Sequence, residues 1–296
     1  MFNEKDPLVQ KDLIAKYLGI DLGYSLGLQY ALNEDNTLSV KGVGECREAV
    51  IRIPSIYAGI PVTKISDGAF LRCSNLGNYA INDDLNLTTI NIPASVQYIG
   101  ESAVSNCINI TVDVDNKEFC AEDGVLFSKD KKTLLCYPTL KPESFYVIPQ
   151  GVEIVGKQAF YECNSLLSVY YPKTLKSIEI SAFARCRSLH SFRRYGERCL
   201  KKLTVCDLAF SNSALRSFTL TNNIDYIGRA AFFDCKDLDL TSWLDEKERS
   251  ELFEKWHPDW DIKSYHPQVR HNVSDDDFDA YLLGNDVFDD VDFELQ

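Results

Sequence analysis

The sequence has no long apolar run and no excess of basic residues. No stretch approaches the ~20 apolar residues that cross a bilayer. The polar start at residues 1–7 carries acidic residues and lacks the apolar region of a secretory signal. The 31 Lys and Arg stand against 44 Asp and Glu, a net charge of −13. Nucleic acid or an anionic membrane would require a basic stripe, so we expect neither as a partner. We predict a cytoplasmic protein without membrane insertion, with the cell surface as the alternative.

The sequence also lacks the common catalytic motifs. It has no Gly-rich phosphate loop, no Gly-x-Ser-x-Gly elbow and no His-Glu-x-x-His. Cys186 and His190 lie close in sequence and could form a nucleophile–base pair, but both occupy repeat positions that packing already explains. We therefore predict that the chain is not an enzyme and needs no cofactor.

What the sequence does contain is a short phrase in six copies. An aliphatic residue is followed four positions later by Ala, then by Phe or Val, and three positions after that usually by Cys. The copies begin at Ile65, Ile99, Val155, Ile178, Val205 and Ile227. The aromatic position is Phe70, Val104, Phe160, Phe183, Phe210 and Phe232 in turn, with spacings of 34, 56, 23, 27 and 22 residues. A basic unit of about 23 residues with insertions falls in the leucine-rich-repeat range and predicts a solenoid.

Each repeat opens with a short strand, which Pro usually ends because it cannot donate to a β-ladder. Examples are residues 50–54, 89–93, 146–149 and 169–172. Gly100, Gly156 and Gly228 follow the second aliphatic pair and would suit a bend with positive φ. Other residue types fill the slot in the remaining copies.

Five of the ten cysteines occupy one repeat position: Cys73, Cys107, Cys163, Cys186 and Cys235. Free Cys behaves as a small buried hydrophobe. Thiols stacked on equivalent positions point in parallel, which disfavours disulfides. The pattern favours structural thiols, and redox or metal roles remain the alternative.

Together the strand, Ile-Pro, Val-x-x-Ile-Gly and Ala-Phe-x-x-Cys elements resemble the BspA-like, surface-antigen type of leucine-rich repeat, over roughly residues 28–240. The following Leu position is Leu76, Ile110, Leu166, Leu189, Leu215 and Leu238. The resemblance implies a curved, right-handed solenoid with short strands on a concave face. It also implies protein-binding or adhesive roles.

We divide the chain into four parts, the second of which contains an insertion. Residues 1–45 are expected to form an N-terminal cap of a helix and a hairpin, and residues 46–240 the repeats. A β-hairpin insertion is expected at about 116–143. Residues 241–271 are expected to form a C-terminal cap helix, and residues 272–296 an acidic, disordered tail.

Two features near the C-terminus allow alternatives. His257, His266 and His271 lie close to Asp259 and are competent metal ligands, but their spacing matches no common metal motif. The Trp-rich stretch before them favours a cap helix and no metal. The tail either docks on a basic, apolar groove or only keeps the protein in solution.

Residues that alternate with inward aliphatics on the strands should face outward. They are Arg52, Asn91, Val147, Tyr170, Arg193 and Thr219, with Thr89, Ser168, Ser191 and Ser217 in a parallel row. Arg and Tyr dominate interface energetics, so these are our candidate binding residues, while a merely solvated sheet face is the other reading. We predict a non-enzymatic repeat protein that binds a protein or surface glycan, with a surface adhesin exported by an unusual route as the alternative.

Overall fold

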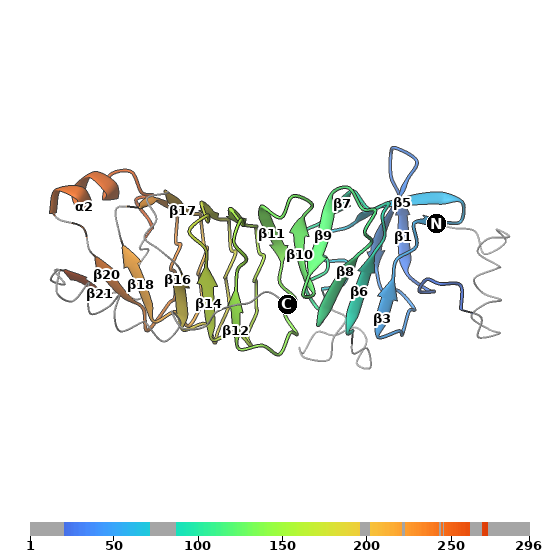
Figure 1. Ribbon diagram of the computed structural model, residues 1–296, viewed down its shortest axis with the longest axis horizontal. Coiled ribbons are helices and arrows are strands. Elements are labelled where there is room, and N and C mark those ends of the chain that lie inside the picture. The colour runs from blue at the N-terminus through green and yellow to red at the C-terminus, as the bar shows by residue number, and fades with distance from the viewer. Residues whose placement is uncertain are drawn as a thin grey trace.

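The computed structural model shows an elongated stack of β-coils, in which the chain runs along the long axis from one end to the other (Figure 1). It describes residues 21–71, 87–195, 202–220, 223–242, 244, 246–260 and 268–271. Each repeat adds one strand to each of two rows of sheets, so neighbouring coils hydrogen-bond to each other. The solenoid expected from the repeats is confirmed.

The first row consists of two parallel sheets. One has β3 (Val50–Arg52), β6 (Thr89–Ile92) and β8 (Asn109–Val112). The other has the order β12 (Phe145–Val147), β14 (Ser168–Tyr171), β16 (Ser191–Arg194), β18 (Ser217–Leu220), β20 (Asp239–Ser242) and β21 (Gln268–His271). We call the outward side of these two sheets the strand face. We use the name six-stranded sheet for the second of them.

The second row forms the side sheets. The N-terminal one contains β1 (Gln29–Leu32), β2 (Leu38–Gly42), β4 (Ile56–Tyr57), β5 (Ile60–Ile65) and β7 (Tyr98–Ile99). The C-terminal one contains β9 (Phe119–Glu122), β10 (Val125–Ser128), β11 (Thr133–Cys136), β13 (Ile154–Val155), β15 (Ser177–Ile178), β17 (Leu203–Val205) and β19 (Ile224–Ile227). The two rows run along opposite edges of the stack in Figure 1.

The Ala-Phe pair forms the corner between rows. The residue before each Ala has a φ between 50° and 59°: Gly68, Ser102, Gln158, Ser181, Leu208 and Ala230. This left-handed turn brings the next peptide against the following coil, where the backbone N–H of Phe160 donates to the carbonyl of Ala182 at 2.8 Å and that of Phe183 to Ala209 at 2.7 Å. The small Ala side chain permits this close approach, and all the corner Ala residues are buried.

Inside the corner the aromatic rings stack on one another. Tyr137, Phe160, Phe183, Phe210 and Phe232 form a continuous column with ring centroids 4.7–5.6 Å apart and interplanar angles of 4–21°. A second set of rings from the strands packs edge-on against this column, as Phe192 does on Phe183 at 5.1 Å. Offset and edge-to-face pairs add to the free energy of burial, so this column is a major source of stability.

The repeated Cys lies under the column as a buried hydrogen-bond donor. The thiol of Cys186 donates to the carbonyl of Phe160 at 2.9 Å, and that of Cys235 to Phe210 at 3.0 Å. Every cysteine in the described part of the chain is free. Ser213 replaces the thiol in one repeat and lies 3.4 Å, Oγ to Sγ, from Cys235. Cys73 lies outside the described residues.

The repeated Gly is explained by space, and the positive φ suggested for it is wrong. None of Gly100, Gly156 and Gly228 has a positive φ. A Cβ on Gly100 would lie 2.2 Å from Oδ1 of Asp67, and one on Gly228 would lie 2.4 Å from Oδ1 of Asp207. These carboxylates accept backbone hydrogen bonds from Glu101 and Arg229, directly after each Gly. Because Gly has no Cβ, the Asp side chain of one coil can approach the next coil closely enough to accept these hydrogen bonds.

The insertion divides the hydrophobic interior into two cores. The expected hairpin is present as β10 and β11, and β9 adds a third antiparallel strand. Val125 and Phe127 on β10 pack into the C-terminal core with Leu134, whereas Leu126 between them packs into the N-terminal core. Because side chains alternate across a strand, the insertion is a layer that faces both cores.

A buried asparagine holds the start of this insertion. The Asn116 side-chain amide donates to the carbonyls of Pro93 and Val96, both at 2.9 Å. Its carbonyl oxygen accepts from the backbone N–H groups of Glu118 and Phe119. All its polar groups are used, which makes a fully buried amide tolerable and ties the insertion to the preceding repeat.

The two ends differ from expectation or lie outside the described residues. β1 and β2 form the expected antiparallel pair, while the helix expected before them lies outside the described residues. The long C-terminal helix is wrong in extent: β20 covers 239–242, α2 (Glu246–Phe253) has eight residues, and β21 continues the six-stranded sheet. The apolar spacing has a tertiary cause, since Leu244, Leu252, Trp256 and Trp260 are buried against the end of the C-terminal core. A capping role for either end stays a prediction, and the tail at 272–296 lies outside the described residues.

Candidate binding face

The strand face presents side chains in rows, one from each coil. Phe145, Ser168, Ser191 and Ser217 align across neighbouring strands, and Val147, Tyr170 and Arg193 align two residues further along. Thr219 stands two residues after Ser217 as Arg193 stands two after Ser191. The residues between these rows, such as Val169, Phe192 and Phe218, are buried. The alternation on which we chose the candidate residues is therefore present.

The six candidate residues do not form one surface. Arg52 and Asn91 are neighbours on β3 and β6, whereas Val147, Tyr170, Arg193 and Thr219 lie on the six-stranded sheet. The insertion interrupts the row between β8 and β12, and no pairing joins these strands in the part of the chain that the structure describes. Sequence spacing alone could not reveal this break.

The N-terminal candidates already have polar partners within the protein. The Arg52 guanidinium lies 3.8 Å from a carboxylate oxygen of Glu48 and 3.9 Å from one of Asp21. Asn91 Oδ1 accepts a hydrogen bond from Thr111 at 2.8 Å. A partner would have to compete with these contacts, so this part of the face is the weaker candidate.

The six-stranded sheet is basic although the whole chain is acidic. Its strands carry Arg193, Arg194 and Arg270 and one carboxylate, Asp239. Arg193 is exposed and Arg194 is half-buried at the end of β16, and the exposed Arg216 leads directly into β18. The sequence prediction named Arg193 but missed Arg194 and Arg216. The adjacent pair at 193–194 was visible in the sequence, whereas the position of Arg216, level with His190 at the entry to the same sheet, needed the coil register.

On the corners and side sheets, by contrast, many cations pair with a carboxylate from a neighbouring coil. Lys176 lies 2.6 Å from Glu153, Lys157 lies 2.6 Å from Glu101, and Arg185 lies 3.0 Å from Glu162. Among the described residues, no carboxylate is within ion-pair distance of Arg194 or Arg216. Arg194 and Arg216 thus differ from these three paired cations.

Aromatic and apolar groups accompany these arginines. Tyr170 is half-buried beside Arg193, and Tyr171 stacks on Phe192 with ring centroids 4.6 Å apart. The Tyr195 hydroxyl donates to the carbonyl of Ile148 at 2.7 Å, and burial raises the pKa of Tyr195 to about 12. Phe145, on the first strand of this sheet, is 57% exposed. Such a mixture of Arg, Tyr and exposed apolar groups is typical of binding surfaces.

The pair considered for catalysis is not arranged for it. Cys186 is fully buried, and this burial raises the pKa of its thiol to about 12. The thiol donates a hydrogen bond to the Phe160 carbonyl. A nucleophilic thiol would need a lowered pKa and access to solvent.

The structure also gives no support to the metal site considered near the C-terminus. His257 Nδ1 accepts a hydrogen bond from the backbone N–H of Asp259 at 3.0 Å. No group of three or more His, Cys, Asp or Glu residues is placed to hold a metal ion within the described ranges. His266 lies outside them.

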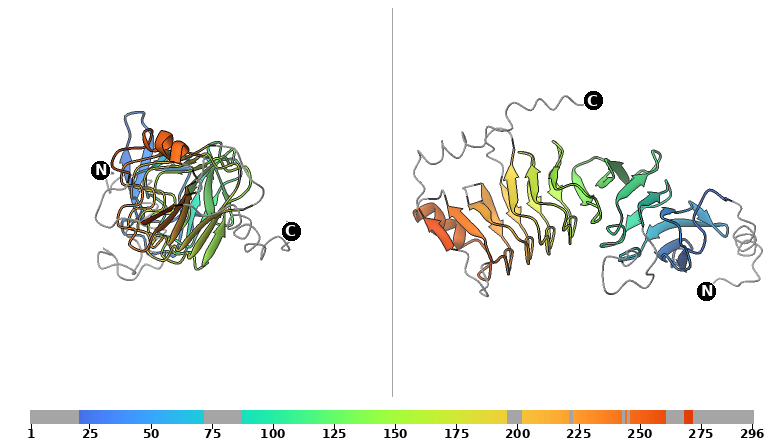
Figure 2. Two further views of the ribbon diagram at one scale, coloured as in Figure 1. Left: turned by 90° about the vertical axis from the view of Figure 1, so that its left-hand side faces the viewer. Right: turned by 90° about the horizontal axis from the view of Figure 1, so that it is seen from below.

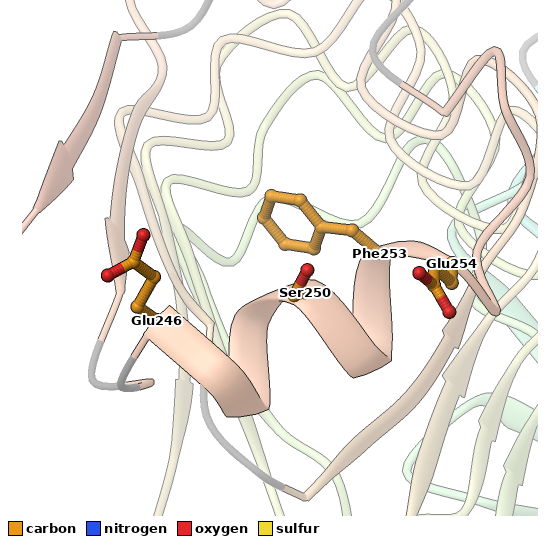
Figure 3. Close-up of a pocket in the computed structure, with 4 residues that line it drawn as sticks. All are labelled: Glu246, Ser250, Phe253 and Glu254. Atoms are coloured by element: carbon orange, nitrogen blue, oxygen red, sulfur yellow. The ribbon is translucent and has the colours of Figure 1, made fainter.

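A shallow depression lies on α2. It is about 490 Å³ in volume and is lined by Glu246, Ser250, Phe253 and Glu254. Figure 3 shows these four side chains along one helix, with the two carboxylates at its opposite ends.

These features define the class of protein. Two rows of short parallel strands, Ala-Phe corners and a stacked aromatic column make the chain a leucine-rich-repeat β-solenoid. The family model for the BspA type leucine rich repeat region matches it in six copies, over residues 74–118 and 143–242. The chain therefore contains leucine-rich repeats of the BspA type, as its resemblance implied.

Two solved structures are similar to the chain. The pneumococcal vaccine antigen PcpA is 25% identical over 62% of this chain and 43% of its own, with a TM-score of 0.50. A leucine rich cell surface protein from Faecalibacterium prausnitzii is 19% identical over 78% of this chain and 96% of its own, with a TM-score of 0.44. This chain therefore spans less than half of the pneumococcal structure. No curated protein sequence matches the chain.

Among the described residues, none of the helices is long and apolar enough to span a membrane. The comparisons lend no support to the cytoplasmic location predicted from the sequence.

Proposed function

We propose that the chain is a non-enzymatic binding protein that recognises a protein partner through the six-stranded sheet. The observation that carries this proposal is the alignment of Tyr170 and Arg193 on adjacent strands, with Arg194 at the end of β16 and Arg216 at the entry to β18. The stacked core beneath holds these side chains in a fixed register, so little conformational entropy is lost on binding.

The size of the sheet sets the extent of the contact. Strands of four residues rise ~13 Å, and six strands span ~24 Å, which gives a flat area of roughly 300 Å². A stable interface buries about 800 Å² on each partner. The partner would therefore also contact residues that lead into the strands, such as Leu167, His190 and Arg216.

A matched pair of double variants tests the proposal. Tyr170→Ala with Arg193→Ala should abolish capture of the partner from native lysate. Tyr226→Ala with Lys176→Ala removes the same kinds of side chain from the side sheets and should leave capture unchanged. Both variants should keep the wild-type melting temperature, because these side chains are not in the core. Equal capture by both would refute the strand face as the binding surface.

The same comparison separates the two partner classes that the sequence left open. A protein partner would appear as a band that the strand-face variant loses. A glycan would instead be displaced by soluble sugar, with no protein band lost.

Display at the cell surface is a second candidate, and the similarity to a vaccine antigen favours it. Protease added to intact cells should then cleave the protein, whereas a cytoplasmic protein would be protected. Surface display and partner binding are compatible, and the second does not depend on the first.

A further inference from the structure

The chain itself contains a segment with chemistry complementary to the six-stranded sheet. Residues 272–296 carry nine acidic residues and no Lys or Arg. Phe278, Tyr281, Phe288 and Phe293 are interspersed among the acids. The sheet offers the opposite charge on Arg193 and Arg194 of β16 and on Arg216 at the entry to β18. Tyr170 aligns with Arg193, and the exposed Phe145 lies on the first strand of the same sheet.

The arginines on the sheet favour an acidic occupant for a physical reason. Elsewhere on the stack, cations such as Lys176 and Arg185 are neutralised by carboxylates at 2.6–3.0 Å from a neighbouring coil. Arg194 and Arg216 have no such carboxylate among the described residues. Arg pairs well with carboxylates while stacking on aromatic rings, so a segment that contains both acidic and aromatic residues matches both properties.

The acidic segment also begins in the right place. It follows β21, which is the last strand of the same sheet and pairs with β20, which pairs with β18. From β21 to β16 is three strand spacings, ~14 Å. An extended chain of 25 residues reaches up to ~85 Å, so the segment can cover the arginines with ample slack. A tether this short gives an effective concentration in the millimolar range, which favours docking within one molecule over docking between two copies.

We propose that residues 272–296 dock onto the six-stranded sheet of the same molecule, over Arg193, Arg194 and Arg216, and so occupy the binding face. This inference rests on the proposed function, because the segment then competes with an external acidic partner. Binding of that partner would require displacement of the segment, and raising the salt concentration would weaken both contacts.

Photo-crosslinking in the full-length protein tests the proposal. A benzophenone amino acid in place of Phe288 should crosslink to residues 167–194 or 216–219 within a monomer. Arg194→Glu with Arg216→Glu should reduce the yield roughly fivefold or more, because exposed pairs turn from attraction to repulsion. The control, Arg185→Glu with Arg229→Glu, reverses two arginines away from the strand face and should keep the wild-type yield.

A second set of variants protects the test against a misfolded sheet. Asp289→Asn, Asp290→Asn and Asp292→Asn leave the solenoid untouched and should lower the crosslink yield to a similar extent. Crosslinks only between two copies, crosslinks elsewhere, or a yield that these variants do not change would each overturn the proposal. The proposed function is judged separately, by whether Tyr170→Ala with Arg193→Ala loses a partner that the side-sheet control retains.

Discussion

The two halves of the stack are built from the same repeat, but the C-terminal half is the more regular. In the C-terminal half the aromatic column is unbroken from Tyr137 to Phe232, and both rows of strands are continuous. In the N-terminal half Val104 occupies the aromatic position, and the first row has three strands. A solenoid tolerates such variation because each coil needs only its neighbours, provided that a layer such as β9–β11 seals the junction.

Figure 2 shows the same division from below, with the strands on either side of the insertion forming two successive groups. The comparison teaches that the register of the coils, and not the repeat sequence, decides which surface is continuous. The four experiments below test how far the halves behave as separate units.

Alkaline pH should have the largest effect and should act first on the C-terminal half. Burial raises the pKa of Cys186 to about 12 and that of Cys235 to about 11, and it also raises the pKa values of Cys163, Tyr137 and Tyr146. The folded chain keeps these protons when the unfolded chain has lost them. The free energy of unfolding is therefore highest below pH 9.0, the ordinary pKa of a thiol. It falls as the pH rises from there towards 12.

The described N-terminal core contains fewer such groups, namely Cys46, Cys107 and Cys136. Circular dichroism between about pH 9 and 12, with brief proteolysis to locate cleavage, should show the C-terminal half opening first. Simultaneous opening would mean that the two cores form a single cooperative unit.

Truncation at the same repeat position should cost much more in the C-terminal half. Phe183→Ala removes a ring stacked at 4.7 Å on Phe160 and at 5.1 Å on Phe210, and should cost about 3–5 kcal/mol of unfolding free energy. Val104→Ala removes two methyl groups and should cost about 2 kcal/mol. Urea denaturation of both variants gives these values, and equal losses would contradict a stabilising role for the aromatic column.

Adjacent residues of β10 should stabilise different halves. Leu126→Ala should cost about 2–5 kcal/mol and speed hydrogen exchange mainly in the N-terminal core. Phe127→Ala should have a cost at the upper end of that range and speed exchange mainly in the C-terminal core. Mass spectrometry of peptides from 38–65 and 160–218 reads the two cores separately. An identical exchange pattern for both variants would argue against the two-faced layer.

The smallest effects should come from the glycines, and here the halves should behave alike. Gly100→Ala and Gly228→Ala each push a Cβ to within 2.5 Å of an Asp on the preceding coil, and each should cost about 1–3 kcal/mol. Gly156→Ala meets the Leu134 carbonyl at 2.9 Å and should cost less. Thermal melts of the three variants provide the ranking. If Gly156→Ala were the most harmful, close approach to Asp would not be the reason for the glycine.

Much of the architecture was predictable because it repeats. Six copies of Ile-x-x-x-Ala-Phe locate the coils, and Val169, Phe192 and Phe218 are buried as their spacing indicates. The predicted C-terminal helix was too long. Trp256 and Trp260 have helical spacing, but they lie in the turn after α2 and are buried against the C-terminal core. A local pattern cannot distinguish a helix face from a loop that is folded onto an apolar end.

The candidate site was predictable residue by residue but not as a surface. Period-two alternation correctly placed Tyr170 and Arg193 on the outward row, and Arg193 aligns with Tyr170 across β14 and β16. It could not show that Arg52 stands on a different sheet and is engaged with Glu48. That separation arises from a three-stranded insertion whose place in the sheet depends on long-range pairing.

By itself the sequence determined the repeat, the burial of its Ala, Phe and Cys positions, and the type of repeat. Each of these depends on contacts between equivalent residues of adjacent coils. Only the tertiary structure decided where the stack divides, why Gly follows the second strand, and which arginines gather on one sheet. Those outcomes depend on the register between coils of unequal length, and register is set by hydrogen bonds and packing between residues far apart in the chain.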